Sequence, residues 1–239
     1  EALAAGAGHG SSFIDQYDNQ WHIGTISISQ KHMFERRLGL YPAFFDNNDT
    51  YYAVTKYGDF PLIMPKKRIW RFEDVFPGWM LLSYGKEVTV SSYIDSLPPS
   101  YMTDENIRTY WAAASGNRGE YATLDLGKPF DVYAIQINFA EHVTQIFGRE
   151  SRLSHRYVVT YSSDGSTSNM LIDKTINNTD NSHPYEQLAQ KVNCRYLRVT
   201  NMKVPGGHFA ISGFRVFGKG EGIAPARISR LDVKRNPDD

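Results

Sequence analysis

The stretch GEYATLDLGKPFDVYAIQI (119–137) carries the clearest secondary-structure pattern in the chain. Within it, LDLGKPFDV predicts a strand, a turn at Gly127 and a second strand, because runs of strand-forming residues flank the glycine. Two strands joined in this way present an apolar edge that packs across a β-sandwich. We therefore predict antiparallel β-structure around residues 119–137.

Similar short runs lie on both sides of this stretch, and helical periodicity is nearly absent. Their β-branched and aromatic residues, bounded by turn-forming sequences, predict antiparallel strands. The Asp164-Gly165 pair in SSDGST predicts a tight hairpin turn, since glycine adopts a positive φ there without strain. We expect an all-β chain with one short helix at 104–110. The runs are WHIGTISIS (21–29), TYYAVTKYG (50–58), KEVTVSS (86–92), RYVVTYS (156–162), RYLRVTN (195–201) and FRVFG (214–218).

Two changes in composition suggest domain boundaries. FPLIMPKKR (60–68) is a junction rich in proline and lysine, and GKGEGIAPAR (218–227) is a linker rich in glycine and proline. We predict a propeller remnant at residues 1–65, a β-sandwich at 66–218, and a linker or the start of a further module at 219–239. The first part holds roughly four strands, about one propeller blade, and one blade cannot close a ring by itself.

Composition excludes several classes of function. Of 239 residues, 41% are hydrophobic and 22% are charged, the balance of a globular protein. The 26 basic and 26 acidic residues cancel, so we predict no nucleic-acid partner. No apolar run approaches the ~18–20 residues of a membrane helix, so we predict no membrane insertion. Cys194 is the single cysteine, which excludes an internal disulfide.

Five motifs, in this order along residues 102–218, identify a known family. They resemble the coagulation factor V/VIII type C, or discoidin, family, which includes the family 32 carbohydrate-binding modules. The resemblance implies a discoidin-like (galactose-binding-like) antiparallel jelly-roll β-sandwich. The family usually has a tryptophan after the hairpin turn, where Ser168 stands here. The motifs are MTDENIRTYWAA (102–113), the 119–137 stretch, YVVTYSSDGST (157–167), CRYLRVTNMK (194–203) and HFAISGFRVFG (208–218).

The resemblance implies a structural calcium in the loop ahead of Trp111. Asp104, Asn106 and Thr109 would line the site, with Asp104, Thr109 and backbone carbonyls holding the ion, because Ca²⁺ prefers oxygen ligands on a flexible loop. The alternative is a helical turn capped by Asp104 without metal. Two departures weigh against calcium, since Glu105 occupies the family's usual glycine position and Gly213 stands where many relatives have glutamate.

In this family the sugar sites lie on loops at one end of the sandwich. The loops AEHVTQIFGRESRLSH (140–155) and VPGGHFA (204–210) carry suitable groups. Planar polar groups bond sugar hydroxyls, and an aromatic face packs on the C–H side of the ring. The alternative is a solvated charged loop with the phenylalanine buried beneath it. The predicted ligand-binding residues are Glu141, His142, Arg149, Arg152, His155, His208 and Phe209.

Two segments near the beginning, at 6–29 and 34–61, resemble the last part of a family 43 glycoside hydrolase propeller. The motif GHGS with a following phenylalanine and the ending ERRLGLYPAFF…YGDFP carry this second resemblance. It makes His9 the counterpart of a histidine that helps to hold a cation near the propeller axis. The alternative is a histidine satisfied by hydrogen bonds in a turn.

Catalysis is not expected from this chain alone. Family 43 enzymes hydrolyse arabinosyl or xylosyl linkages with inversion, using two carboxyl groups ~6.5–9.5 Å apart. The resemblance implies that those groups come from earlier blades. The carboxylates of the first part belong to no recognisable catalytic motif, so we predict turn or salt-bridge roles for them. They are Asp15, Glu35, Asp46 and Asp59.

The leading hypothesis is a non-catalytic carbohydrate-binding module that targets a parent glycoside hydrolase to plant or host polysaccharide. A second hypothesis makes the sandwich a structural buttress of the propeller in the same chain, with no sugar site. A third makes the chain part of an intact family 43-like arabinosidase or xylosidase. By resemblance, we expect a secreted, periplasmic or cell-surface protein.

Overall fold

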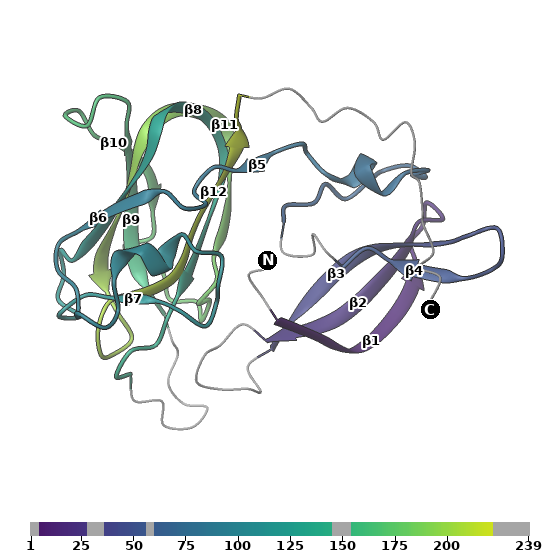
Figure 1. Ribbon diagram of the computed structural model, residues 1–239, viewed down its shortest axis with the longest axis horizontal. Coiled ribbons are helices and arrows are strands. Elements are labelled where there is room, and N and C mark those ends of the chain that lie inside the picture. Colours follow the sequence, from purple (N-terminus) through teal and green to yellow (C-terminus); the bar gives the residue numbers. More distant parts are fainter. Residues whose placement is uncertain (1–4, 28–35, 56–59, 145–153, 222–239) are drawn as a thin grey trace, which may run out of the picture.

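The computed structural model describes residues 5–27, 36–55, 60–144 and 154–221 (Figure 1). Strands dominate these residues, which confirms the all-β prediction, and none of the helices described there is long and apolar enough to cross a bilayer. Two short 3-10 helices occur, η1 (Phe72–Val75) and η2 (Pro99–Met102). The helix expected at 104–110 is wrong. Glu105 adopts a φ of 56°, which a right-handed helix does not accept, and a turn replaces it.

The first part is a four-stranded antiparallel sheet in the order β1-β2-β3-β4 (Figure 1). Its hairpins β1–β2 and β3–β4 close with the same turn chemistry. The Asp15 carboxylate accepts the Tyr17 and Asn19 amides, and Asp46 likewise accepts amides two and four residues later. Such side-chain bonds favour turns over continued strand. The strands are β1 (Ala5–Ile14), β2 (Gln20–Ser27), β3 (Arg36–Phe45) and β4 (Tyr51–Ala53).

The second part is one antiparallel sheet of eight strands in the order β10-β9-β11-β8-β12-β5. Strand β6 adds to β8, and β7 adds to β12. Each neighbouring pair is antiparallel, as hairpin-rich all-β folds require. The strands are β5 (Met80–Leu81), β6 (Glu87–Val90), β7 (Trp111–Ala112), β8 (Tyr121–Phe139), β9 (Arg156–Ser162), β10 (Asn169–Asp173), β11 (Tyr185–Lys203) and β12 (Ala210–Lys219).

This sheet folds over on itself because the two long strands, β8 and β11, each serve both layers of a sandwich. Residues 121–125 of β8 pair with β6 and with the second half of β11, whereas 131–139 pair with β12 and with the first half of β11. Gly127, at a φ of 90°, lies between the two halves of β8. The predicted antiparallel β-sandwich is therefore confirmed. We call the layer formed by β6, β8, β11, β9 and β10 the first layer.

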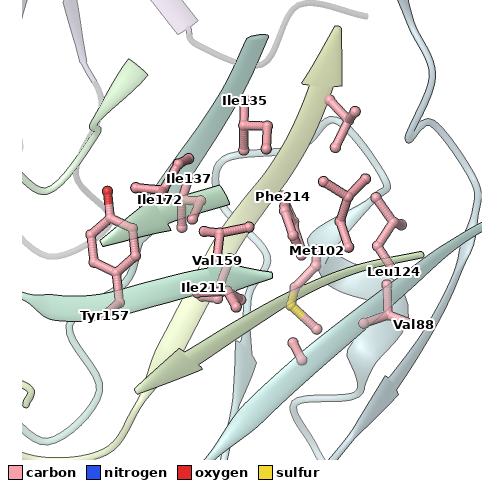
Figure 2. Packing of buried hydrophobic residues seen from close by; sticks show 14 of the residues in the cluster. Val88, Met102, Leu124, Ile135, Ile137, Tyr157, Val159, Ile172, Ile211 and Phe214 are labelled. Carbon is pink, nitrogen blue, oxygen red and sulfur yellow. The ribbon is translucent and has the colours of Figure 1, made fainter. Parts of the chain in front are cut away.

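The sandwich core lies between these layers (Figure 2). Alternate residues of the strands point inward, as the period of two requires. Leu124 and Val159 come from the first layer and meet Ile135 and Phe214 from the other. All four are almost fully buried. The burial of these and the other apolar side chains of the core is the main source of the sandwich's stability.

The segment 60–79 contacts both parts of the molecule. Ile69 and Val75 pack with Trp21 of β2 in a small separate core, and the Asn19 side chain bonds the backbone of the same segment. At its beginning, Phe60 packs edge-on against Phe217 of β12, with ring centroids 5.9 Å apart. The predicted boundary at residue 65 thus falls inside a segment that is packed rather than extended as a free linker.

Candidate functional site

Two loops meet at the end of the sandwich where sugar contacts were predicted. One follows β8, the other joins β11 to β12, and an isolated bridge pairs His142 with His208. The His208 amide donates to the His142 carbonyl at 3.0 Å, and the Thr144 hydroxyl donates to the Gly206 carbonyl at 2.9 Å. Gly207, at a φ of 67°, approaches so closely that a Cβ there would lie 2.1 Å from the His142 oxygen. The loops are therefore held together by a backbone bond, a threonine hydroxyl and close backbone packing at Gly207.

Three half-buried polar rings lie together at this pairing, and we call them the loop-end cluster: Tyr110, His142 and His208. The two imidazoles meet edge to face, with centroids 5.1 Å apart. The Tyr110 hydroxyl lies 3.1 Å from His142 Nδ1, and His208 Nδ1 donates to the Ala113 carbonyl at 2.9 Å. Sequence reasoning missed Tyr110, although it stands directly before Trp111 in the first family motif.

Two predicted ligand contacts are corrected by their burial. Phe209 is 1% exposed and packs edge-on against Trp111 at 5.5 Å, so it offers no face to a sugar. His155 is 4% exposed and stacks flat on Phe139 at 4.1 Å. This burial lowers the pKa of His155 to about 3. Both side chains pack against Phe139 inside the sandwich, each directly before the first residue of a strand.

The other predicted contacts divide between the described and undescribed parts of the chain. Glu141 is half-buried beside His142 in the same loop. Arg149 and Arg152 lie outside the described residues. The structure therefore brings His142 and His208 together and adds Tyr110, and the two arginines stay a prediction.

The loop predicted to hold calcium is closed by its own hydrogen bonds. Asp104 accepts the Asn106 amide at 2.9 Å and the Thr109 hydroxyl at 2.6 Å. Its oxygens suit a hard cation, but both are already engaged by these two hydrogen bonds. The neighbouring Glu105 instead reaches Arg215 of β12. Within the described residues no group of three or more His, Cys, Asp or Glu side chains forms a metal site.

Arg215 is a fully buried arginine that sequence reasoning did not single out. Its Nε and one terminal nitrogen donate to the two carboxylate oxygens of Glu105 at 3.1 and 3.0 Å. The other terminal nitrogen donates to the Gln136 side-chain oxygen at 2.8 Å. The guanidinium also lies 5.3 Å from the Phe60 ring centre and 5.0 Å from that of Phe217. This ion pair ties the 104–109 turn to the sandwich.

A family model agrees with this architecture. The model of the F5/8 type C domain matches residues 87–213, more than half of the chain. The chain belongs to the F5/8 type C domain family. The matched region of this F5/8 type C domain contains the 104–109 turn and all three residues of the loop-end cluster. The four-stranded sheet lies outside it.

Solved structures resemble this F5/8 type C domain at low sequence identity. Chitosan-binding module 1 of a chitosanase/glucanase from Paenibacillus sp. IK-5 is 20% identical with a TM-score of 0.48, over 58% of this chain and 99% of that one. CpGH89CBM32-4 from Clostridium perfringens, in complex with GlcNAc-α-1,4-galactose, is 19% identical with a TM-score of 0.48, over 61% and 98%. A structure described as a glycoside hydrolase is 19% identical with a TM-score of 0.45, over 90% and 47%. No curated protein matches the chain.

Of the metal and carboxylate positions predicted in the first part, the structure describes His9, Asp15 and Asp46. His9 is exposed in β1 at a φ of 50°. Burial of Asp15 raises the pKa of its carboxyl group. Hydrogen bonds from Trp21, Asn19 and Tyr17 outweigh this effect and lower the pKa to about 2. Asp15 and Asp46 lie in turns, as predicted, and Glu35 and Asp59 lie outside the described residues.

Proposed function

We propose that this F5/8 type C domain is a non-catalytic carbohydrate-binding module whose sugar site includes the loop-end cluster. The observation that carries the proposal is the backbone pairing of His142 with His208 at the end of the sandwich, with the Tyr110 hydroxyl 3.1 Å from His142 Nδ1. Loops fixed on a rigid scaffold are where binding residues usually lie. The sugar-binding proteins named among the similar structures support this assignment only as analogies.

The chemistry of the cluster suits a neutral sugar. Because the Nδ1 of His208 donates to the Ala113 carbonyl, its Nε2 is the acceptor in the neutral ring and can accept a hydrogen bond from a sugar hydroxyl. Tyr110 and His142 add a hydroxyl and a second imidazole. A few hydrogen bonds and one small contact surface leave little free energy after ordering costs, so we expect Kd values on the order of micromolar to millimolar.

The test is a glycan array followed by calorimetry with galactose-, arabinose- and xylose-containing glycans. We expect His208→Ala to weaken binding about tenfold or more, since the loss of one hydrogen bond between neutral groups costs roughly 1.4 kcal/mol. The matched control is His22→Ala, the same substitution on a half-buried histidine of the four-stranded sheet. Silence of the wild-type chain across a broad plant and host glycan panel would contradict the proposal.

We further propose that the module tethers a parent family 43-like hydrolase to its polysaccharide and acts outside the cytoplasm, in a secreted, periplasmic or cell-surface protein. Tethering raises the local substrate concentration without new catalytic groups. The four antiparallel strands in sequential order support a propeller blade. The test is the hydrolysis of insoluble arabinoxylan by the full-length parent, which should slow in the His208→Ala variant while arylglycoside hydrolysis is unchanged. Equal rates on arabinoxylan would contradict tethering.

A structural buttress is the second candidate. The packing of Phe60 on Phe217 favours it, because the segment 60–79 then joins the four-stranded sheet to the sandwich through apolar contacts. If the sandwich is only a buttress, Phe60→Ala would lower the unfolding temperature of the four-stranded sheet while no glycan binds to the wild-type chain. Glycan binding that is lost in His208→Ala would reject this second candidate.

A further inference from the structure

The outer face of the first layer carries a row of polar side chains across four strands. Thr89 of β6 lies opposite Thr123 of β8, Thr123 lies opposite Arg198 of β11, and Arg198 lies opposite Thr160 of β9. Their sequence neighbours Val88, Leu124, Leu197 and Val159 are buried in the core. Since successive side chains of a strand alternate between faces, the four polar residues point away from the core. None of them belongs to the loop-end cluster.

This row lies in a groove with a cavity volume of about 300 Å³, within the size of a small-ligand site. Tyr196 and Ser162 extend its lining beyond the row. The β9–β10 turn closes one side, because Gly165 lies so near that a Cβ would be 3.2 Å from the Tyr196 ring. Asp164 accepts hydrogen bonds from Ser162, Ser166 and Thr167 in this turn, which fixes its shape.

Arg198 gives the groove a positive charge and forms no ion pair with another described residue. Its guanidinium lies 4.2 Å from the Tyr121 ring centre, and its Nε donates to the Thr123 hydroxyl at 2.8 Å. These two contacts orient the group without neutralising it. By contrast, Arg195 on the same strand forms two bonds of 2.7 Å with Asp125. The terminal nitrogens of Arg198 are therefore presented to a ligand by groups that are themselves uncharged.

We propose that this groove is a second glycan site that binds a sugar residue bearing a carboxylate, that is, a uronate. The planar guanidinium matches a carboxylate in a bidentate geometry. The Thr89 and Thr160 hydroxyls would bond the sugar hydroxyls, and the Tyr196 ring would pack on its C–H face. The inference goes beyond the proposed loop-end site, since it needs neither His142 nor His208. Two sites on one module would also strengthen binding to a polysaccharide by avidity.

The test titrates the ¹⁵N-labelled chain with trigalacturonate and, as the neutral match, with its methyl ester. We expect amide shifts at Thr89, Thr123 and Thr160 with a Kd on the order of millimolar. Because salt screens the exposed charge of Arg198, we expect weaker binding as NaCl is raised from about 50 mM to about 500 mM. Arg198→Gln should weaken trigalacturonate binding about tenfold or more, whereas Arg108→Gln, at an exposed arginine outside the groove, should not.

The failure of this inference can be separated from the failure of the loop-end proposal. Equal binding of the acid and its methyl ester, no effect of Arg198→Gln, or no binding of trigalacturonate would each overturn the groove. Neutral-glycan binding that is lost in His208→Ala would still support the loop-end site. Because Arg198 is exposed, the Arg198→Gln variant should keep the wild-type spectrum without ligand. Thr123→Val is a second variant, which removes only the hydroxyl that accepts the hydrogen bond from Arg198 Nε.

Discussion

The sandwich and the four-stranded sheet are both antiparallel, yet they bury their apolar side chains in different ways. The sandwich packs two layers of its own strands face to face, so its core is enclosed. The sheet buries Trp21 only with help from Ile69 and Val75 of the segment 60–79. It leaves large apolar side chains exposed, namely Phe13, Ile14, Leu38, Phe45 and Tyr52. A single sheet cannot enclose a core, so its stability depends on whatever covers it.

The same contrast extends to polar groups. In the sandwich, the Glu105–Arg215 pair is buried and joins a turn to a central strand. At the sheet, Asn19 is 2% exposed and joins the β1–β2 turn to the backbone of Lys67 and Ile69. Both are buried polar connections, but one lies within a complete domain and the other holds a covering segment in place. Substitutions at the two places should therefore affect different parts of the molecule.

The largest effect is expected from Arg215→Met. It leaves the Glu105 carboxylate buried without its cation, which should destabilise the sandwich by about 3–5 kcal/mol. Chemical denaturation followed by tryptophan fluorescence measures this loss. The double variant Glu105→Leu with Arg215→Met removes both charges and should recover at least about 2 kcal/mol of it. A single-variant loss below about 1 kcal/mol would contradict the importance of the pair.

Asn19→Ala should cost less and act locally. It leaves the Ile69 amide and the Lys67 carbonyl without their side-chain partner, at about 2–3 kcal/mol. Hydrogen exchange should become faster in β1–β3 while β8 and β11 keep their protection, because the sandwich core does not include this junction. The control is Asn48→Ala, at the exposed asparagine of the corresponding β3–β4 turn. Equal acceleration in all strands would refute the contrast between the two parts.

How far the sequence could predict these features depends on the range of the contacts involved. Strand alternation and the 119–137 motif are local, so the sandwich was predictable. The helix at 104–110 failed because its side chains favour helix capping, whereas Glu105 has a positive φ and its carboxylate pairs with Arg215, 110 residues away. Burial of Phe209 depends on Trp111, which no loop pattern specifies.

The groove shows even more clearly that contacts between distant residues cannot be predicted from local sequence patterns. Thr89, Thr123, Thr160 and Arg198 become neighbours only through the register of four strands. Each is an unremarkable polar position in its own alternating run. A threonine or arginine on the solvent face of a strand has no local signature of binding, so sequence reasoning placed the candidate site only on the loops.

A moderate, pH-dependent effect is expected at His155. Its pKa is about 3 in the folded chain, against an ordinary value of 6.5, so the unfolded chain binds more protons below pH 6.5. Stability should fall as the pH drops from about 6.5 towards 3, by about 2 kcal/mol at pH 5. His155→Phe keeps a ring on Phe139 and should abolish this part of the loss in denaturation at pH 7 and pH 5. An unchanged pH dependence would show that the buried histidine is not its cause.

The smallest effect concerns the 104–109 turn, where calcium binding is still a proposal. Asp104 and Thr109 already bond each other, and Glu105 is engaged by Arg215, so a calcium ion would gain little beyond one carboxylate. A site with a Kd of about 1 mM would add about 1 kcal/mol at about 5 mM free Ca²⁺. That corresponds to a rise in Tm of about 2–4 °C over EDTA. Asp104→Asn should remove the rise, and Asp95→Asn, outside the turn, should keep it. If calcium leaves the Tm of the wild-type chain unchanged, the turn is held by its hydrogen bonds and the Glu105–Arg215 pair alone.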